Sequence, residues 1–468
     1  MSDKTPELSL QTLIHDNKAK KNVITIEGTV DTGFEGIALE ECIEIFGNEV
    51  KCCRSRGRIF FNIVSDAENI YKLRKMRSVD NLYQIISTEK IDFDGKDKDV
   101  DLSTIKDIVN RYDFKQDIPV WASCMAYLGI AFPTSEQSQR ALAVNNILKE
   151  KAGSANKKEG EADVKVEGSE SIDSLKNDCD EIKLDKVKIN EELPSNKEEL
   201  DQYLRDNELN VLKFRATCNR VGKHSFSSME AARDFGGQLH DNYMWLVDLK
   251  YYDLEVVLNI CDYEIYIGLA LTRESMHKRN ITHFGPTTLR ATLCHNLLRF
   301  ARPQIGDIVV DPLCGGGSIP FECSLAFPYT FNICGDNHEK AVNRTLCNLN
   351  SLETLYKKPL PLDVFQWDAA RLPLRSGSVD VFTTDLPFGK RSGRKIDNGP
   401  LYRRVMKELT RVVRLESGRA VLMTHDRKTF TKIFSSFSQY WTNQHRIGIN
   451  LGGLDAGVFV LKRTARMI

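Results

Sequence analysis

The strongest constraint on the fold is a regular alternation of strand-like and helix-like segments in the C-terminal third of the chain. Short β-branched runs such as DIVVDPL and FNICGDN alternate with longer stretches of helical spacing. The predicted strands lie near 307–313, 331–337, 361–368, 378–385, 418–426 and 444–462, and the predicted helices near 318–327, 339–352 and 401–413. This alternation is typical of a doubly wound, mostly parallel α/β sheet. In such sheets, ligands bind beyond the carboxyl ends of the strands.

The first half of the chain has the mixed pattern of an α+β fold. Predicted strands lie at 22–30, 56–64, 78–88, 211–220, 254–262 and 264–271, and predicted helices at 32–47, 65–76 and 227–245. Ser65 and Asp66 are both good N-cap types for the second helix. Ser227 and Glu230 have capping-box spacing at the start of the third.

One polar segment interrupts this first half. Residues 151–208 hold 17 acidic and 10 basic residues and almost no aromatic side chains, so they cannot bury enough surface to offset the entropy lost on ordering. We therefore predict an acidic disordered insert over 145–208. The predicted segments are a flexible tail (1–20), an α+β region (21–275) that contains the insert, a linker helix introduced by Pro286 (276–300), and the α/β domain (301–468).

Composition excludes several classes of protein. No run of about 18 uninterrupted apolar residues is present, which argues against a membrane-spanning helix, and the first residues lack a secretory signal core. The 12 cysteines are scattered without a C-x-x-C pair, as in a cytosolic or nuclear protein with reduced thiols. We predict no metal site. We also predict a cytoplasmic protein, and the same composition is compatible with a second pool in the nucleus.

Acids or glycine turns follow four successive predicted strands. They are Asp311 with the glycines at 315–317, then Asp336, Asp368 and Asp385. Glycines let a backbone approach a ligand closely, and an acid about twenty residues later suits a ribose diol. Each acid alone is more often a cap or a turn residue, but four at one sheet edge indicate a binding site.

The stretch TTDLPFGKR places an acid, a rigid turn and an aromatic ring in a fixed order. With DPLCGGG, GDN and QWDAARLP, it resembles the class I S-adenosylmethionine-dependent methyltransferases that methylate amino groups of nucleic acids, although Leu386 stands where that motif has its first proline. Together with RNITHFGPTTLR at 279–290 and FRATCNR…EAARDFGG upstream, it is similar to the THUMP-domain tRNA guanine-N2-methyltransferases.

The resemblance implies an N-terminal ferredoxin-like part and a THUMP domain within 21–275, then a Rossmann-like catalytic domain. It implies S-adenosylmethionine as cofactor, tRNA gripped near its acceptor stem and 3′ end, guanosine 6 as the target, and a small zinc-binding activator subunit as partner. The cofactor contacts it implies are Asp311, Pro312, Gly315 and Gly317 for the methionine part, Asp336 and Asn337 for the ribose, Asp368 and Ala369 for the adenine, and Asp385.

The chemistry of the amine explains the ordered motif. The exocyclic amine of guanine is a poor nucleophile, because its lone pair is conjugated into the ring. Asp385 and the backbone carbonyl of Leu386 or Pro387 can accept its two N–H bonds and free that lone pair. Phe388 offers a face on which a flipped base can stack. No metal is needed when orientation beside a reactive sulfonium supplies much of the rate.

Several cations are candidates for RNA contact, although a solvated surface cation is the commoner case for any one of them. They are Arg215, Arg220, Lys223, Arg233, Arg279, Arg290, Lys390 and Arg391. His277, His283 and His425 show no metal-ligand spacing and are predicted to be structural.

Other functions stay open at this stage. The same chemistry could serve a spliceosomal small nuclear RNA or an adenine N6 amine. A non-catalytic RNA-binding protein would be expected to lack the glycine loop or Asp385, and both are present. A dehydrogenase is disfavoured because Pro320 stands where its glycine motif requires the last glycine.

Overall fold

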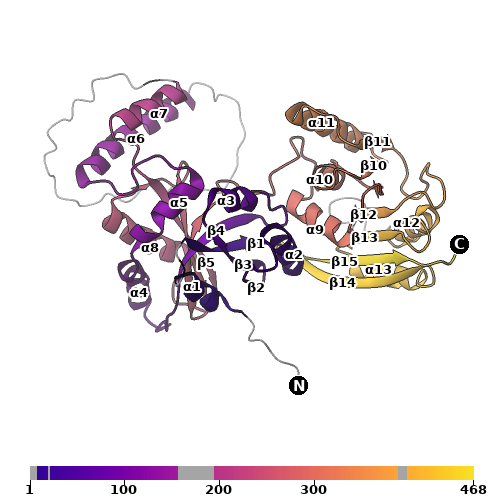
Figure 1. Ribbon diagram of the computed structural model, residues 1–468, viewed down its shortest axis with the longest axis horizontal. Coiled ribbons are helices and arrows are strands. Elements are labelled where there is room, and N and C mark those ends of the chain that lie inside the picture. Colours follow the sequence, from indigo (N-terminus) through magenta and orange to yellow (C-terminus); the bar gives the residue numbers. More distant parts are fainter. Residues whose placement is uncertain are drawn as a thin grey trace. The chain divides into compact units, whose positions relative to one another are not determined.

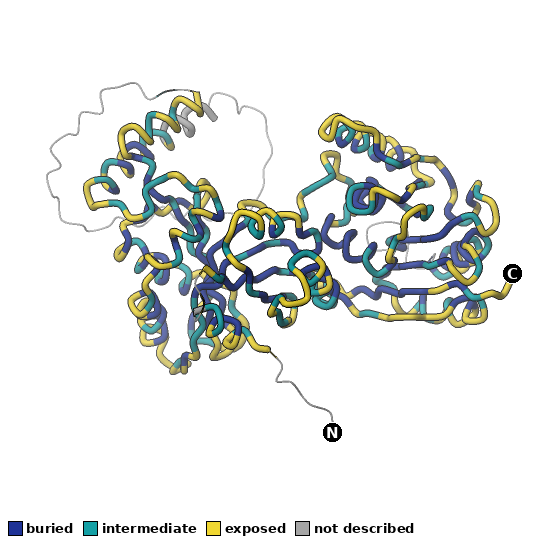
Figure 2. Tube along the Cα trace, viewed as in Figure 1, coloured by how far each residue is buried: buried dark blue, intermediate teal, exposed yellow. Residues whose placement is uncertain are grey.

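The computed structural model describes residues 8–18, 20, 22–156, 194, 196–387 and 398–467. The chain forms two compact units: Met1–Thr88 together with Ala270–Ile468, and Glu89–Leu269. Figure 1 labels the elements of each unit, and Figure 2 shows which segments are buried. Among the helices that the structure describes, none is long and apolar enough to span a bilayer.

The C-terminal part of the first unit is built on a seven-stranded sheet in the order β11-β10-β9-β12-β13-β15-β14. Its strands are β9 (Ile308–Asp311), β10 (Phe331–Asp336), β11 (Leu362–Gln366), β12 (Val381–Asp385), β13 (Arg419–Thr424), β14 (Trp441–Leu451) and β15 (Leu454–Arg463). Neighbours from β11 to β13 are parallel, whereas β15 is antiparallel to β13 and β14. This confirms the predicted doubly wound sheet, with its strand order reversing between β9 and β12.

Helices precede or connect these strands (Figure 1), and many of their apolar residues are buried. They are α9 (Ala291–Ala301), α10 (Ser318–Ala326), α11 (Glu339–Tyr356), α12 (Asn398–Val412) and α13 (Arg427–Ser435). Apolar residues of α12 such as Val405 and Leu409 are fully buried and share a core with Phe382 of β12 and Leu422 of β13. The carboxyl ends of β9 and β12 are thereby fixed next to each other.

The N-terminal part of the same unit has the β-α-β-β-α-β succession of a ferredoxin-like fold. It comprises β1 (Val23–Thr29), α2 (Glu35–Phe46), β2 (Cys52–Ser55), β3 (Arg58–Val64), α3 (Ala67–Leu73) and β4 (Asn81–Lys90), preceded by α1 (Leu10–Lys18). Within it the strand order is β2-β3-β1-β4, and neighbouring strands are antiparallel. Asp66 caps α3 as predicted, since its carboxylate accepts a hydrogen bond from the backbone N–H of Asn69.

The second unit carries strands in the order β8-β7-β5-β6 and a set of helices. Its elements are α4 (Lys98–Arg111), η1 (Phe114–Gln116), α5 (Ile118–Met125), α6 (Ser135–Asn156), α7 (Lys197–Asp206), β5 (Lys213–Val221), α8 (Ser228–Tyr243), β6 (Leu246–Val247), β7 (Leu254–Cys261) and β8 (Glu264–Ala270). The capping box predicted at Ser227 and Glu230 is present at the start of α8.

Two segments predicted to be disordered are partly helical. Residues 10–18 of the predicted tail form α1, whose Leu13 is buried and accepts a hydrogen bond of 2.8 Å from the Asn62 amide. The predicted insert is too wide at both ends, because α6 continues past 145 and α7 lies before 208. Apolar side chains of both helices share a small core. Residues 157–193 lie outside the described residues.

The predicted linker helix begins later than expected. Residues 276–290 are irregular, and α9 starts only after Arg290. Pro286 does not open a helix, because the Thr288 hydroxyl bonds the backbone N–H of Gly285 at 2.7 Å and holds a turn there. Several elements were not predicted. They are the helices α4, α5, α6 and α13 and the short strands β2 and β6.

Candidate active site

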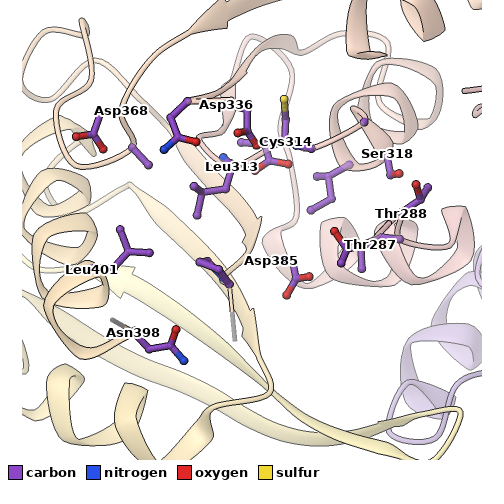
Figure 3. Close-up of a pocket in the computed structure, with 18 residues that line it drawn as sticks. Thr287, Thr288, Leu313, Cys314, Ser318, Asp336, Asp368, Asp385, Asn398 and Leu401 are labelled. Carbon is purple, nitrogen blue, oxygen red and sulfur yellow. Dashed lines mark hydrogen bonds between the residues drawn. The ribbon is translucent and has the colours of Figure 1, made fainter. Parts of the chain in front are cut away.

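A cavity of about 280 Å³ opens at the carboxyl ends of the parallel strands. Of the sequence-predicted residues, it is lined by Asp311, Gly315, Asp336, Asn337, Asp368, Ala369, Asp385 and Pro387. Figure 3 shows the labelled acids converging from successive strand ends. Among the described lining residues there are four carboxylates and no lysine, arginine or histidine. A cavity with this charge suits a cationic ligand and disfavours a polyphosphate.

The glycine turn brings backbone against the cavity. Gly315 and Gly317 have φ of 57° and 87°, which is left-handed backbone that favours glycine. A Cβ at Gly317 would lie 2.4 Å from the Phe321 ring. Gly317 itself does not line the cavity but is the N-cap of α10, so its role is to shape the turn.

Asp336 ties the second strand end to this turn. Its Oδ2 accepts a hydrogen bond of 3.2 Å from the N–H of Gly315, and its Oδ1 accepts one of 3.0 Å from His338. The carboxylate is therefore held at the cavity wall, where a diol could donate to its remaining lone pairs. Asn337 lies beside it in the wall, whereas Pro312 does not line the cavity and accepts a hydrogen bond of 3.2 Å from the Trp367 indole.

Asp368 is the exposed acid of the set. Its Oδ1 accepts a hydrogen bond of 2.9 Å from Ala370, which shapes the turn after β11 and leaves the side chain at the rim. The neighbouring Ala369 is buried. An acid and a small apolar residue side by side suit the amino edge and the face of a base.

Asp311 and Asp385 form the floor of the cavity, at the ends of two adjacent strands. The Thr384 hydroxyl donates to Asp311 Oδ1 at 2.7 Å. Burial raises the pKa of Asp311 to about 7. Burial, and then the charge of Asp311, raise the pKa of Asp385 to about 8.

Asp385 also has an enclosed oxygen without a partner. Its Oδ1 is shielded from solvent and accepts no hydrogen bond from any described residue. Buried acceptors are rarely left unpaired, and a ligand that brings a donor would remove the cost. Asp385 is therefore the residue most clearly prepared for a ligand N–H.

The backbone that follows Asp385 is fixed by hydrogen bonds. The N–H of Leu386 donates to the Met423 carbonyl at 2.8 Å. The buried Tyr402 hydroxyl donates to the Pro387 carbonyl at 2.5 Å and bonds Thr424 Oγ1 at 2.8 Å. Of the two carbonyls predicted to face the substrate, that of Pro387 is thus engaged by the core. Phe388, Lys390 and Arg391 lie outside the described residues.

Sequence reasoning missed part of the wall. Thr287, Thr288 and Leu289 line the cavity from the irregular segment before α9, and Asn398 and Leu401 line it from α12. Thr287, Thr288 and Leu289 lie within the predicted linker helix, and no local sequence pattern indicated that they line the cavity. The helix α12 was predicted from its spacing, but its contact with the cavity depends on the fold.

The predicted RNA-binding cations have protein partners in several cases. Arg215 pairs with Glu255 at 2.9 Å, Arg233 with Asp234 at 2.8 Å, and Arg290 with Asp80 at 3.3 Å. Arg220 bonds the Gly222 carbonyl, and Lys223 is exposed. These assignments stay predictions. The Arg279 guanidinium likewise donates to Glu322 and to the carbonyls of Met276 and Arg77. Among the described residues, no group of three or more His, Cys, Asp or Glu is arranged to hold a metal.

Comparison with known proteins places the chain in a family. Residues 279–455 match the model of the RMKL-like methyltransferase domain, and residues 189–270 match the THUMP domain. The chain is 41% identical to the tRNA (guanine(6)-N(2))-methyltransferase THUMP3 of Bos taurus, over 94% of this chain and 88% of the relative. It is 24% identical to the U6 snRNA (guanine-N(2))-methyltransferase THUMPD2 of Bos taurus, over 79% of this chain and 72% of that relative.

The fold is shared with a solved structure. The crystal structure of TrmN from Thermus thermophilus superposes with a TM-score of 0.62 at 18% identity, covering 94% of this chain and 99% of that one. The sequence identity to the bovine enzyme, over almost the whole chain, decides the family. The chain belongs to the THUMP-domain guanine-N2-methyltransferases, as the strand-end acids and the TTDLPFG stretch indicated.

Proposed function

We propose that this protein transfers the methyl group of S-adenosylmethionine to the N2 amine of a guanosine in tRNA, at position 6 of the acceptor stem. The observation that carries the proposal is Asp385, a half-buried carboxyl at the end of β12 with one oxygen that is shielded from solvent and has no partner among the described residues. The identity of 41% to a tRNA enzyme, against 24% to a U6 snRNA enzyme, supports tRNA as the substrate class.

The residues of the cavity fit S-adenosylmethionine. Asp336 would hold the ribose diol, Asp368 and Ala369 the adenine, and Asp311 with the turn at Gly315 the methionine part. The four carboxylates match a ligand whose sulfonium and ammonium groups outweigh its one carboxylate. When bound, this cofactor supplies a methyl group on a positively charged sulfur.

Asp385 then acts on the amine of guanine. Its carboxylate accepts one N–H of the amine, and the Leu386 carbonyl accepts the other, while the Pro387 carbonyl is held by the hydrogen bond from Tyr402. These two acceptors orient the nitrogen lone pair toward the methyl carbon. A methyl group on this nitrogen would make its remaining protons more acidic. Asp385, whose pKa burial raises to about 8, takes the released proton.

We further propose that the protein works with the small zinc-binding activator subunit implied by its family resemblance. The activator is expected to raise the stability and activity of the catalytic chain, as a heterodimer partner that binds only the folded state. Co-purification of the two chains, followed by comparison of turnover with and without the activator, tests this partner separately from the chemistry.

The decisive experiment is methyl transfer from labelled S-adenosylmethionine to unmodified tRNA, with nucleoside mass spectrometry of the product. We expect N2-methylguanosine, mapped to position 6, from the parent protein with the activator present. A U6 snRNA transcript is the matched competitor. Product on U6 snRNA alone would reverse the choice of substrate, and N6-methyladenosine would reverse the choice of amine.

A further inference from the structure

A second cavity of the first unit lies at the amino ends of the parallel strands and is lined by cations. Its volume is about 690 Å³, within the range of roughly 300–1,000 Å³ that is usual for small-molecule sites. We call it the Arg302 groove, and its lining includes Arg54, Phe300, Arg302, Arg419, Ile447 and Lys462. Among the described residues, it shares no lining residue with the catalytic cavity.

The register of the sheet separates the Arg302 groove from the catalytic cavity. Arg419 opens β13 opposite Val381 of β12, whereas Asp385 ends β12 opposite Met423. These positions are four residues apart along the strand, or about 13 Å at roughly 3.3 Å per residue. Arg419 and Lys462 lie directly opposite each other in an antiparallel pair, so their side chains share one face of the sheet. The groove is therefore a site of its own.

Cations converge on the groove from four separate parts of the unit. Arg54 lies on β2, Arg302 directly after α9, and Lys462 on β15, and none of these three side chains forms an ion pair with a described residue. The fourth cation, Arg419, pairs with Asp307 through Nη2, but its Nε–H is enclosed and has no acceptor among the described residues. Enclosed donors are rarely left unpaired, so an anion in the groove would remove a cost.

Two acids also line the groove, but they do not neutralise it. The Glu35 carboxylate is used by the fold, since it accepts hydrogen bonds from the N–H groups of Gly33 at 2.9 Å and Gly57 at 2.7 Å. Glu40 is exposed. The four cations outnumber these two acids, and His445 lines the same groove. The catalytic cavity holds four carboxylates and no described cation, so the two ends of the sheet suit ligands of opposite charge.

The groove also has an apolar surface. Ile37 of α2 and Ile447 of β14 line it, together with Phe300 at the end of α9. Phe300 is half-buried, and its ring packs against that of Phe34 with centroids 5.8 Å apart. A flat ring held in this way suits contact with a nucleobase, and cations beside it suit the phosphate of the same ligand.

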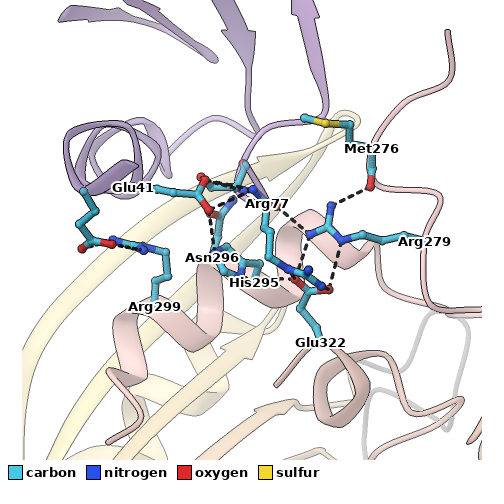
Figure 4. A network of polar contacts seen from close by, with 10 residues as sticks. Glu41, Arg77, Met276, Arg279, His295, Asn296, Arg299 and Glu322 are labelled. Atoms are coloured by element: carbon cyan, nitrogen blue, oxygen red, sulfur yellow. Dashed lines mark hydrogen bonds and ion pairs between the residues drawn. The ribbon is translucent and has the colours of Figure 1, made fainter. Parts of the chain in front are cut away.

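The two helices that contribute to the groove are fastened to each other, as Figure 4 shows. His295 of α9 lies 3.2 Å from Glu41 of α2 through Nε2, and 3.3 Å from the buried Glu322 of α10 through Nδ1. Nearer the end of α9, Arg299 pairs with the exposed Glu44 of α2 at 2.6 Å. The first half of α2 and the last residues of α9 line the groove. A preformed site of this kind loses little ordering entropy on binding.

We propose that the Arg302 groove binds a nucleoside phosphate, with the phosphate among Arg54, Arg302 and Lys462 and the base against Phe300. The ligand is a free nucleotide or a nucleotide of single-stranded RNA, because both present a phosphate and an accessible base together. The inference goes beyond the proposed function, since it depends neither on the catalytic cavity nor on which amine is methylated.

The test measures binding to the full chain by calorimetry. The probes are the common ribonucleoside 5′-monophosphates, uncharged nucleosides, inorganic phosphate and a single-stranded oligoribonucleotide. The variants Arg302→Gln and Lys462→Gln each remove one exposed cation of the groove. The matched control is Lys432→Gln, which removes an exposed lysine of α13 outside the groove. The affinity for S-adenosylmethionine is measured for each variant to show that the catalytic cavity is intact.

Each groove variant should lower the affinity for the nucleotide probe by about tenfold, whereas Lys432→Gln should match the parent. Uncharged nucleosides and inorganic phosphate should bind more weakly than the nucleotide, because each lacks one of the two contacts. Affinity for S-adenosylmethionine should stay within about twofold of the parent in every variant, since none of the three lysines and arginines lines the cavity. Saturating S-adenosylmethionine should not displace the nucleotide.

The probes also separate the two sources of the ligand. Binding of the monophosphates that the groove variants weaken supports the proposal with a free nucleotide. The same sensitivity with the oligoribonucleotide alone supports it with RNA. The proposal is overturned if no probe binds, if neither groove variant weakens binding, if inorganic phosphate binds as tightly as the nucleotide, or if S-adenosylmethionine displaces the nucleotide. A parent protein that methylates no tRNA contradicts the proposed function and leaves these outcomes unchanged.

Discussion

Asp385 and Glu322 are both acids of the first unit with enclosed oxygens, and the pKa of Asp385 is raised whereas that of Glu322 is lowered. Asp385 has an enclosed oxygen with no partner among the described residues, and burial raises its pKa to about 8. Glu322 is fully buried, yet His295, Arg77 and Arg279 hold its pKa well below the usual range of a glutamate. The partners, rather than burial itself, decide whether a buried acid is a stabilised ion or a group left ready for a ligand.

The largest expected effect comes from removing the acid at the ligand site. Asp385→Asn should lower kcat/KM for methyl transfer by about 10³-fold, because the amide cannot take up the proton and accepts the amine N–H more weakly than a carboxylate does. Its stability at pH 7 should rise by more than about 1 kcal/mol, because the raised pKa of Asp385 makes folding take up a proton at that pH, a cost that a neutral amide does not carry. Single-turnover assays and urea titrations measure both quantities.

The control for that variant is Asp363→Asn, at an exposed acid of β11 outside the cavity, which should behave as the parent does. A loss of stability of several kcal/mol in Asp385→Asn, together with retained activity, would remove the distinction between the two acids.

The reverse result is expected at the partnered acid. Glu322→Gln should destabilise the first unit by about 3 to 5 kcal/mol, because it leaves buried cations without their counter-charge. Urea denaturation measures the loss, with Glu44→Gln as a control expected to change stability by less than about 1 kcal/mol. If Glu322→Gln and Glu44→Gln lower the free energy of unfolding by the same small amount, the buried contacts of Glu322 stabilise the fold no more than the exposed ion pair of Glu44 does.

The same contrast shows how far sequence reasoning reaches. Asp311, Asp336, Asp368 and Asp385 could be predicted as one site, because parallel strands bring their carboxyl ends to one edge. Local sequence shows that an acid follows each of these strands. The order of the parallel strands in the sheet then brings the four acids together. The ion pair of Arg279 with Glu322 could not be predicted, because it joins the irregular segment before α9 to α10, and no sequence spacing reports such a contact.

The backbone beside Asp385 shows a second limit. The motif could not decide between the carbonyls of Leu386 and Pro387, since the choice depends on Tyr402, which reaches Pro387 from α12. Likewise, the proline at 286 suggested the start of a helix. Instead, the hydrogen bond between Gly285 and Thr288 holds a turn there, and residues 287–289 line the cavity.

A smaller effect is expected from that tyrosine. Tyr402→Phe removes the hydrogen bond to the Pro387 carbonyl and should lower kcat by about tenfold, the equivalent of one buried hydrogen bond of roughly 1 to 1.5 kcal/mol. Cofactor affinity should stay within about twofold, because Tyr402 does not line the cavity. Stopped-flow turnover and calorimetry separate the two. Loss of cofactor binding with normal kcat would show that Tyr402 supports the cofactor rather than the substrate.

The smallest effect, and the most direct test of the unpartnered state of Asp385, is the pH dependence of cofactor binding. Below about pH 8 the free protein holds a proton on Asp385, and a cationic ligand beside the carboxyl lowers its pKa, so binding releases that proton. Affinity for S-adenosylmethionine should therefore rise with pH up to about 8 and then level off, by no more than about tenfold per pH unit for one proton. The uncharged product, S-adenosylhomocysteine, should show a weaker slope.

Asp311, with a pKa of about 7, adds to the slope at lower pH, so the diagnostic window is pH 7 to 8. In that window Asp385→Asn should flatten the curve, whereas Glu322→Gln should leave it unchanged, because Glu322 is already ionised throughout. Equal slopes for the two ligands would mean that the sulfonium does not lie beside these acids.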